Sequence, residues 1–111
     1  MRLGILTDIH ANREAYEACL ERLARAGAEQ LVILGDIVGY GAEPGFAVER
    51  TMELAEKGAI VVRGNHDQAL TEPHWVRNPA AREIIEWTRG QLTPAQIGWL
   101  AALPISVRLD E

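Results

Sequence analysis

Three short runs of apolar residues stand out along the chain, at positions 3–6, 31–34 and 59–62. None of them alternates with polar residues, as a strand with one solvated face would. Continuous apolar runs of this length are typical of strands buried on both faces, as in parallel sheets, although a short run can also belong to a buried helix. The β-branched residues in the second and third runs favour strands.

The segments between these runs have the spacing of helices. Asn12 is a suitable N-cap, the residues at 16, 19, 20 and 23 follow an apolar helical stripe, and Gly27 stands where a left-handed helix end is expected. A second helix is expected from Phe46 to Lys57, closed by Gly58. The resulting β-α-β-α-β order implies parallel strands joined by right-handed crossovers.

The rest of the chain is predicted to be mainly helical. Asn78 and Thr93 each precede a proline, and an N-cap residue followed by proline commonly opens a helix, so helices are expected over about 79–92 and 94–103. Pro104 should end the second of them. Residues 105–109 alternate like the start of a strand, and residues 72–77 are expected to form a loop.

Composition narrows the functional classes. The chain has 111 residues, of which 48% are hydrophobic and 24% charged, as expected for a single globular domain, residues 1–111, of the α/β class. The formal net charge is −5, and the basic residues are scattered, so stable nucleic-acid binding is not expected. No apolar run has the length of a membrane span or a signal-peptide core, so a soluble cytoplasmic protein with no membrane contact is expected.

Polar residues follow each of the three apolar runs. Asp8 and His10 come after the first, Asp36 after the second, and Asn65 and His66 after the third. In open α/β sheets ligands bind just beyond the carboxyl ends of parallel strands, so these side chains are expected to converge. Two carboxylates, two imidazoles and an amide oxygen suit Mn²⁺, Fe²⁺, Ni²⁺ or Zn²⁺ better than Ca²⁺ or copper. The sequence therefore predicts a metal site.

The motifs Asp8-x-His10, Gly35-Asp36 and Gly64-Asn65-His66-Asp67, in this order, resemble the first three motifs of the calcineurin-like metallophosphoesterase superfamily. Their flanking residues resemble its small bacterial and archaeal phosphoesterase branch. This resemblance implies hydrolysis of small phosphate mono- or diesters with two divalent metal ions. Manganese is the expected metal, with iron, nickel and zinc as alternatives.

The resemblance also implies a role for each site residue. Asp8 and His10 would ligate the first metal ion, Asp36 would bridge the two ions, and Asn65 would ligate the second. His66 would be catalytic, by protonating the leaving alkoxide or stabilising the transferring phosphoryl group. Two neighbours carry further hypotheses: Asp67 would orient His66, as carboxylates orient imidazoles elsewhere, and Tyr40 could place its hydroxyl on the substrate.

The family's fold is a four-layer sandwich of two sheets, and this chain matches only its N-terminal half. It is expected to form one β-α-β-α-β layer followed by two helices, with the second sheet largely missing. Family members also carry a further histidine and a Gly-His-x-His motif that are not found here. This chain is therefore expected to hold fewer metal ions than the complete site, one or none.

Two alternatives to a working phosphoesterase stay open. The chain could be a non-catalytic module that binds a metal ion or a partner protein. It could also be an oligomer, because a missing second sheet would leave an apolar face and an unpaired strand edge, and both favour association. A homo-oligomer through the exposed sheet face is expected.

Overall fold

The computed structural model describes residues 1–109, which contain one three-stranded parallel sheet. Strands β1 (Leu3–Leu6), β2 (Gln30–Ile33) and β3 (Ile60–Val61) lie side by side in that order. The crossovers between them contain helices α1 (Arg13–Arg25) and α2 (Pro44–Glu56). The β-α-β-α-β order predicted from the apolar runs is therefore confirmed.

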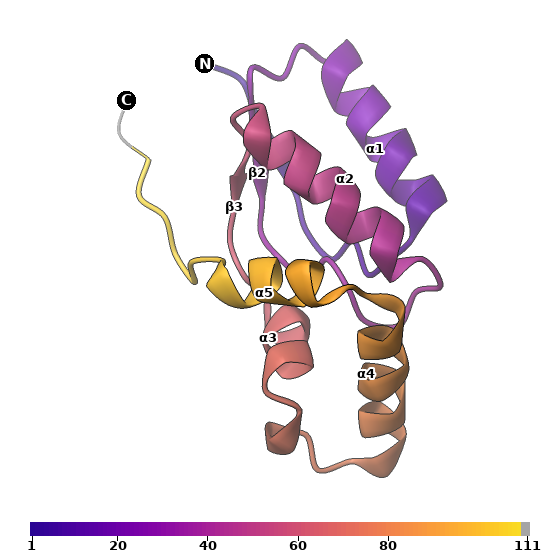
Figure 1. The fold of residues 1–111 in the computed structure, drawn as a ribbon. Helices are drawn as coiled ribbons and strands as arrows, with labels where there is room; N and C mark the ends of the chain where they lie inside the picture. The colour runs from indigo at the N-terminus through magenta and orange to yellow at the C-terminus, as the bar shows by residue number, and fades with distance from the viewer. Residues whose placement is uncertain (110–111) are drawn as a thin grey trace.

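The segment after β3 is mainly helical as far as Ala102 and lies beyond the carboxyl ends of the strands (Figure 1). It consists, in order, of α3 (Asn65–Thr71), a short 3₁₀ turn η1 (Pro73–Trp75), α4 (Pro79–Gln91) and α5 (Pro94–Ala102). The predicted N-caps are observed: the side chain of Asn78 accepts from two backbone N–H groups of α4, and that of Thr93 accepts from Gln96 N of α5. Both helices end within one residue of the expected position.

Helices α1 and α2 cover one face of the sheet and enclose the core with it (Figure 1). Ile33 and Val48 are completely buried there. One polar link crosses this core: the Tyr16 hydroxyl of α1 lies 2.7 Å from Thr51 Oγ1 of α2, which itself donates to the Ala47 carbonyl at 2.7 Å. Because the Thr51 proton is used on Ala47, the Tyr16 hydroxyl is the donor in the link.

Within residues 1–109, no helix lies over the opposite face of the sheet (Figure 1). Leu3 and Ile5 of β1 and Leu34 after β2 are 46%, 55% and 45% exposed. Single exposed apolar side chains are ordinary, but neighbouring ones on a single sheet face leave apolar surface in water. One uncovered layer is what the family resemblance predicts for residues 1–109, and self-association through this face stays a prediction.

The polar residues after the third strand open helix α3, which lies within the part of the chain that was expected to be mainly helical. One expectation about local structure was wrong. Residues 105–109 are not a strand, since no strand within residues 1–109 pairs with them, and Ile105 is 72% exposed. An alternating sequence pattern does not by itself form a strand, because the backbone N–H and C=O groups of a strand need partners on a neighbouring strand.

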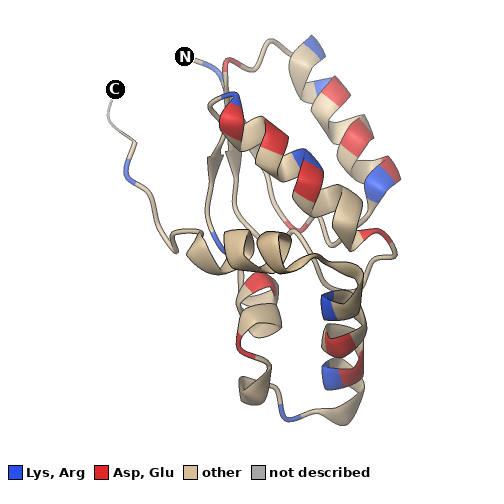
Figure 2. Cartoon of the chain, viewed as in Figure 1, with Lys and Arg blue, Asp and Glu red and all other residues tan. Residues whose placement is uncertain are grey.

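Charged side chains are mixed in sign over the surface. Acidic and basic residues occur together on α1 and on α4, and α5 carries neither (Figure 2). The absence of stable nucleic-acid binding stays a prediction. Over residues 1–109, every helix is too short or too polar to cross a lipid bilayer.

Candidate metal centre

The loops that follow β1 and β2 have an unusual backbone. Among the described residues, the non-glycine residues with positive φ all lie in these two loops: Asp8 (55°), His10 (46°), Ala11 (56°), Asp36 (52°) and Tyr40 (65°). Such conformations cost roughly 1–3 kcal/mol each and concentrate at functional sites. Here the loops hold each other in place, since His10 N donates to Asp36 O at 2.9 Å and Ala11 N donates to Ile37 O at 2.8 Å.

Two glycines allow the loops after β2 and β3 to touch through their backbones. Gly35 has a φ of +92°, and a Cβ added to it would overlap the backbone nitrogen of Gly64. A Cβ added to Gly64 would in turn overlap Asp36. Glycine is needed at both positions because any side chain would push Asp36 away from the start of α3.

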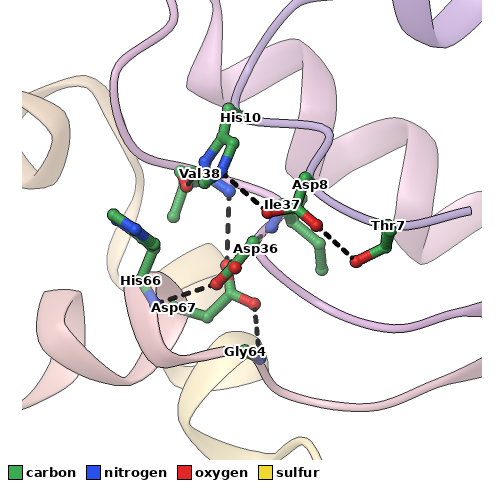
Figure 3. Close-up of polar contacts among 9 residues, drawn as sticks. All are labelled: Thr7, Asp8, His10, Asp36, Ile37, Val38, Gly64, His66 and Asp67. Carbon is green, nitrogen blue, oxygen red and sulfur yellow. Dashed lines mark hydrogen bonds and ion pairs between the residues drawn. The ribbon is translucent and has the colours of Figure 1, made fainter.

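A buried carboxylate joins the same two loops. Asp67 is completely buried, and its Oδ1 accepts from Ile37 N at 2.9 Å and Val38 N at 3.2 Å, while its Oδ2 accepts from Gly64 N at 2.9 Å (Figure 3). Burial raises the pKa of Asp67, and the three backbone donors offset this only in part.

The expectation that Asp67 orients the His66 ring is therefore wrong, because both of its oxygens bind backbone amides. Its carboxylate fixes the loop around Asp36 and the start of α3 relative to each other. Any effect of Asp67 on the His66 ring comes through the position of that helix.

The predicted site residues lie together at the carboxyl ends of the strands (Figure 3). His10, Asp36 and His66 each offer a ligand atom, and these atoms lie within 4.8 Å of one another. Asp8 joins them through its Oδ1, which is 3.3 Å from His10 Nε2. Asn65 joins them through its amide, 3.2 Å from each carboxylate oxygen of Asp36. Residues from two loops and the first turn of α3 thus meet at one point.

The hydrogen bonds around His10 leave one ring nitrogen for a ligand. Its Nδ1 lies 3.1 Å from the Val38 carbonyl, so this nitrogen carries a proton and donates it. In the neutral ring Nε2 then presents a lone pair to the Asp8 carboxylate. A nitrogen lone pair and a carboxylate oxygen attract each other only when a proton or a metal cation lies between them. Histidines that bind a metal ion are commonly held by a hydrogen bond from their other ring nitrogen, as His10 is here.

The two carboxylates of the site are each fixed by a neighbour. Asp8 Oδ2 accepts from Thr7 Oγ1 at 2.7 Å, and this hydrogen bond, with the nearby His10, lowers the pKa of Asp8. Asp36 Oδ1 accepts from His66 N at 2.9 Å. With its nitrogen toward Asp36, the Asn65 amide donates to both carboxylate oxygens; with its oxygen toward them, the two groups need a cation between them. The donor set fits a divalent metal ion.

Three rings cluster at the mouth of the site. The imidazoles of His10 and His66 have centroids 4.8 Å apart, and the ring of Tyr40 lies 5.2 Å from the first and 4.9 Å from the second. Tyr40 is nevertheless 69% exposed. The ring contacts were not foreseen from the sequence, where only the hydroxyl of Tyr40 was considered, and its contact with substrate stays a prediction.

Comparison with known proteins identifies relatives of this chain. The sequence model of calcineurin-like phosphoesterases matches residues 1–110. The chain is 32% identical over 107 residues to an uncharacterized protein of Methanocaldococcus jannaschii, MJ0912, covering 95% of this chain and 43% of the relative. It is 39% identical over 80 residues to the phosphodiesterase YfcE of Escherichia coli, covering 65% of this chain and 43% of YfcE.

A solved structure supports the same relationship. The crystal structure of a metallophosphoesterase from Sphaerobacter thermophilus superposes with a TM-score of 0.74 at 41% sequence identity, covering 94% of this chain and 42% of that protein. The chain thus spans less than half the length of these relatives.

Proposed function

The chain belongs to the calcineurin-like phosphoesterase family, and from this premise we propose that its metal centre serves the metal-dependent hydrolysis of a small phosphate mono- or diester. The observation that carries the proposal is the convergence of His10, Asp36 and His66, whose ligand atoms lie within 4.8 Å of one another although they come from two loops and the first turn of α3. The strained backbone around them supports a site that is kept for chemistry rather than for stability.

In this proposal Asp8, His10, Asp36 and Asn65 would hold the metal ions, with Asn65 contributing its side-chain oxygen. The mixed oxygen and nitrogen donors suit manganese, with iron, nickel and zinc as alternatives. A bound divalent ion would supply the positive charge that polarises the phosphoryl oxygens and favours in-line attack by water.

Other groups of the chain would fix the His10 tautomer, hold the loops of the site together and transfer a proton. The Val38 carbonyl holds His10 in the tautomer that leaves Nε2 unprotonated. The carboxylate of Asp67 keeps Asp36 and the start of α3 together. His66, whose backbone nitrogen is bound to Asp36, presents its imidazole at the mouth of the site, where it would protonate the leaving alkoxide.

The test is hydrolysis of bis(4-nitrophenyl) phosphate and 4-nitrophenyl phosphate with Mn²⁺, by the longest natural gene product that contains these residues. Asp36→Asn is the decisive variant, because an asparagine oxygen can still accept from His66 N and so spare the fold. Glu86→Gln, an exposed carboxyl on α4, is the matched control. We expect Asp36→Asn to lose at least about 100-fold in kcat/KM and the control to keep its activity.

Absence of Mn²⁺-dependent turnover, or equal activity of the two variants, would overturn the catalytic proposal. The competing hypothesis is a non-catalytic module that holds a metal ion or a partner protein. It requires at most one tightly bound ion per chain and no turnover. Elemental analysis of the purified protein after Mn²⁺ loading therefore separates the two, since two equivalents together with turnover exclude the module.

A further inference from the structure

A largely apolar pocket of about 170 Å³ opens beside the metal centre, between α3, α4 and the loop after β2. Tyr40, Asn65 and His66, which lie at the metal centre, are among the residues that line it. Leu70 of α3 and Ile84 of α4 line its apolar part. The pocket is therefore continuous with the place where a phosphoryl group would lie.

The lining restricts what the pocket can hold. No Asp, Glu, Lys or Arg residue lines it, so a second phosphate group finds no cationic lysine or arginine partner there. The one hydroxyl in its α4 wall, on Thr88, is already used as a donor to the Ile84 carbonyl at 2.8 Å. Beyond Tyr40, Asn65 and His66 the pocket offers mainly apolar contacts, which favour an uncharged group without hydrogen-bonding edges.

The volume of the pocket limits the size of the group that it can hold. A protein cavity of about 150 Å³ lined by apolar side chains takes up one benzene molecule. A pocket of about 170 Å³ accordingly has room for one six-membered ring and little more. Ile84 at its rim is 39% exposed, so apolar surface is available to gain from a ligand.

We propose that this pocket binds the organic group of the phosphoester, and that it selects a compact apolar group the size of one aromatic ring. The inference rests on the proposed function for the position of the phosphoryl group. Tyr40 and His66 would then lie between the two parts of the substrate, with the ring in the pocket and the phosphorus at the metal centre.

The test measures binding rather than turnover. Benzylphosphonate and ethylphosphonate, which cannot be hydrolysed at an ester bond, are titrated into the Zn²⁺-loaded protein by calorimetry. We expect the benzyl compound to bind at least about tenfold more tightly, since small differences in apolar contact within such pockets are worth factors of this size. Equal affinities would overturn the proposal.

Two neighbouring alanines of α4 provide matched variants. Ala81 lines the pocket, whereas Ala80 is exposed and does not. Ala81→Leu should lower the affinity for benzylphosphonate about tenfold or more and leave ethylphosphonate within about twofold, while Ala80→Leu should change neither. Ala69→Leu, which fills the pocket from α3, repeats the test if Ala81→Leu fails to fold.

A probe without phosphorus separates this inference from the proposed function. Benzyl alcohol alone should shift the methyl resonances of Ile84 and Ile85 by its ring current and leave that of Ile60 unchanged. If these shifts occur and Ala81→Leu removes them, the pocket stands even when Zn²⁺ binding or hydrolysis fails. If Mn²⁺-dependent hydrolysis is found but the shifts are absent, the pocket proposal is wrong and the proposed function stands.

Discussion

The buried carboxylate of Asp67 gives the sharpest test of how the loops are held. It accepts three backbone hydrogen bonds, from Ile37, Val38 and Gly64, at 2.9–3.2 Å. An Asp67→Asn variant keeps one oxygen for the first two donors but places an NH₂ group opposite Gly64 N–H. One part-buried donor then has no acceptor, and the other two bonds lose their charge.

The magnitude follows from these bonds. An unsatisfied donor costs about 1–3 kcal/mol, and hydrogen bonds to a charged acceptor are worth about 1.5–3 kcal/mol against about 1 kcal/mol for a neutral one. Part of this loss is offset, because burial raises the pKa of Asp67, which means that its charge is costly to bury. We expect a net loss of about 2 kcal/mol, a large share of the roughly 5–15 kcal/mol that stabilises a domain.

Urea unfolding followed by circular dichroism measures this loss. With a slope of about 1–3 kcal/mol per molar urea, the midpoint should fall by roughly 1 M. Glu86→Gln removes one exposed carboxyl charge from α4 and serves as the control. Mn²⁺ affinity should fall about 10–100-fold with Asp67→Asn, because the loop that carries Asp36 is no longer fixed to α3. Equal midpoints for the two variants would refute the reasoning about stability, and unchanged Mn²⁺ affinity would refute the reasoning about position.

Three further substitutions test other parts of the structure. Burial raises the pKa of Tyr16 above its ordinary 10.0, so its stabilising effect is complete below pH 10 and is lost as pH rises through the raised value. Tyr16→Phe should lower the free energy of unfolding by about 1 kcal/mol at pH 7. Above pH 10 the melting temperature of this variant should fall less steeply with pH than that of the unsubstituted protein, and equal slopes would contradict this. Gly35→Ala combines a φ of +92° with a clash against the Gly64 backbone, so it should lower the free energy of unfolding by at least about 3 kcal/mol in urea; a milder effect would mean that the loops can separate. Thr93→Ala removes the N-cap of α5, because Thr93 Oγ1 accepts from Gln96 N at 3.1 Å. The variant should lower the free energy of unfolding in urea by about 1 kcal/mol, with no change in Mn²⁺ affinity.

The order of elements and the position of the site could be predicted from the sequence. Apolar runs and capping residues act over a few neighbouring positions, and the strands, α1, α4 and α5 follow from them. The convergence of Asp8, His10 and Asp36 could also be predicted, because parallel strands bring their carboxyl ends to the same edge of a sheet.

Other features depend on contacts that no local pattern encodes. Asp67 binds the backbone at Ile37, 30 residues earlier, and not the adjacent His66. Tyr40 packs its ring near two imidazoles, one from the loop after β1 and one from α3, and the apolar pocket exists only because α4 lies beside α3. Residues 105–109 alternate like a strand but remain unpaired within the described chain. In each case the partner is chosen by the path of the chain and the direction of the side chain, and these are set by packing between distant segments rather than by sequence neighbours.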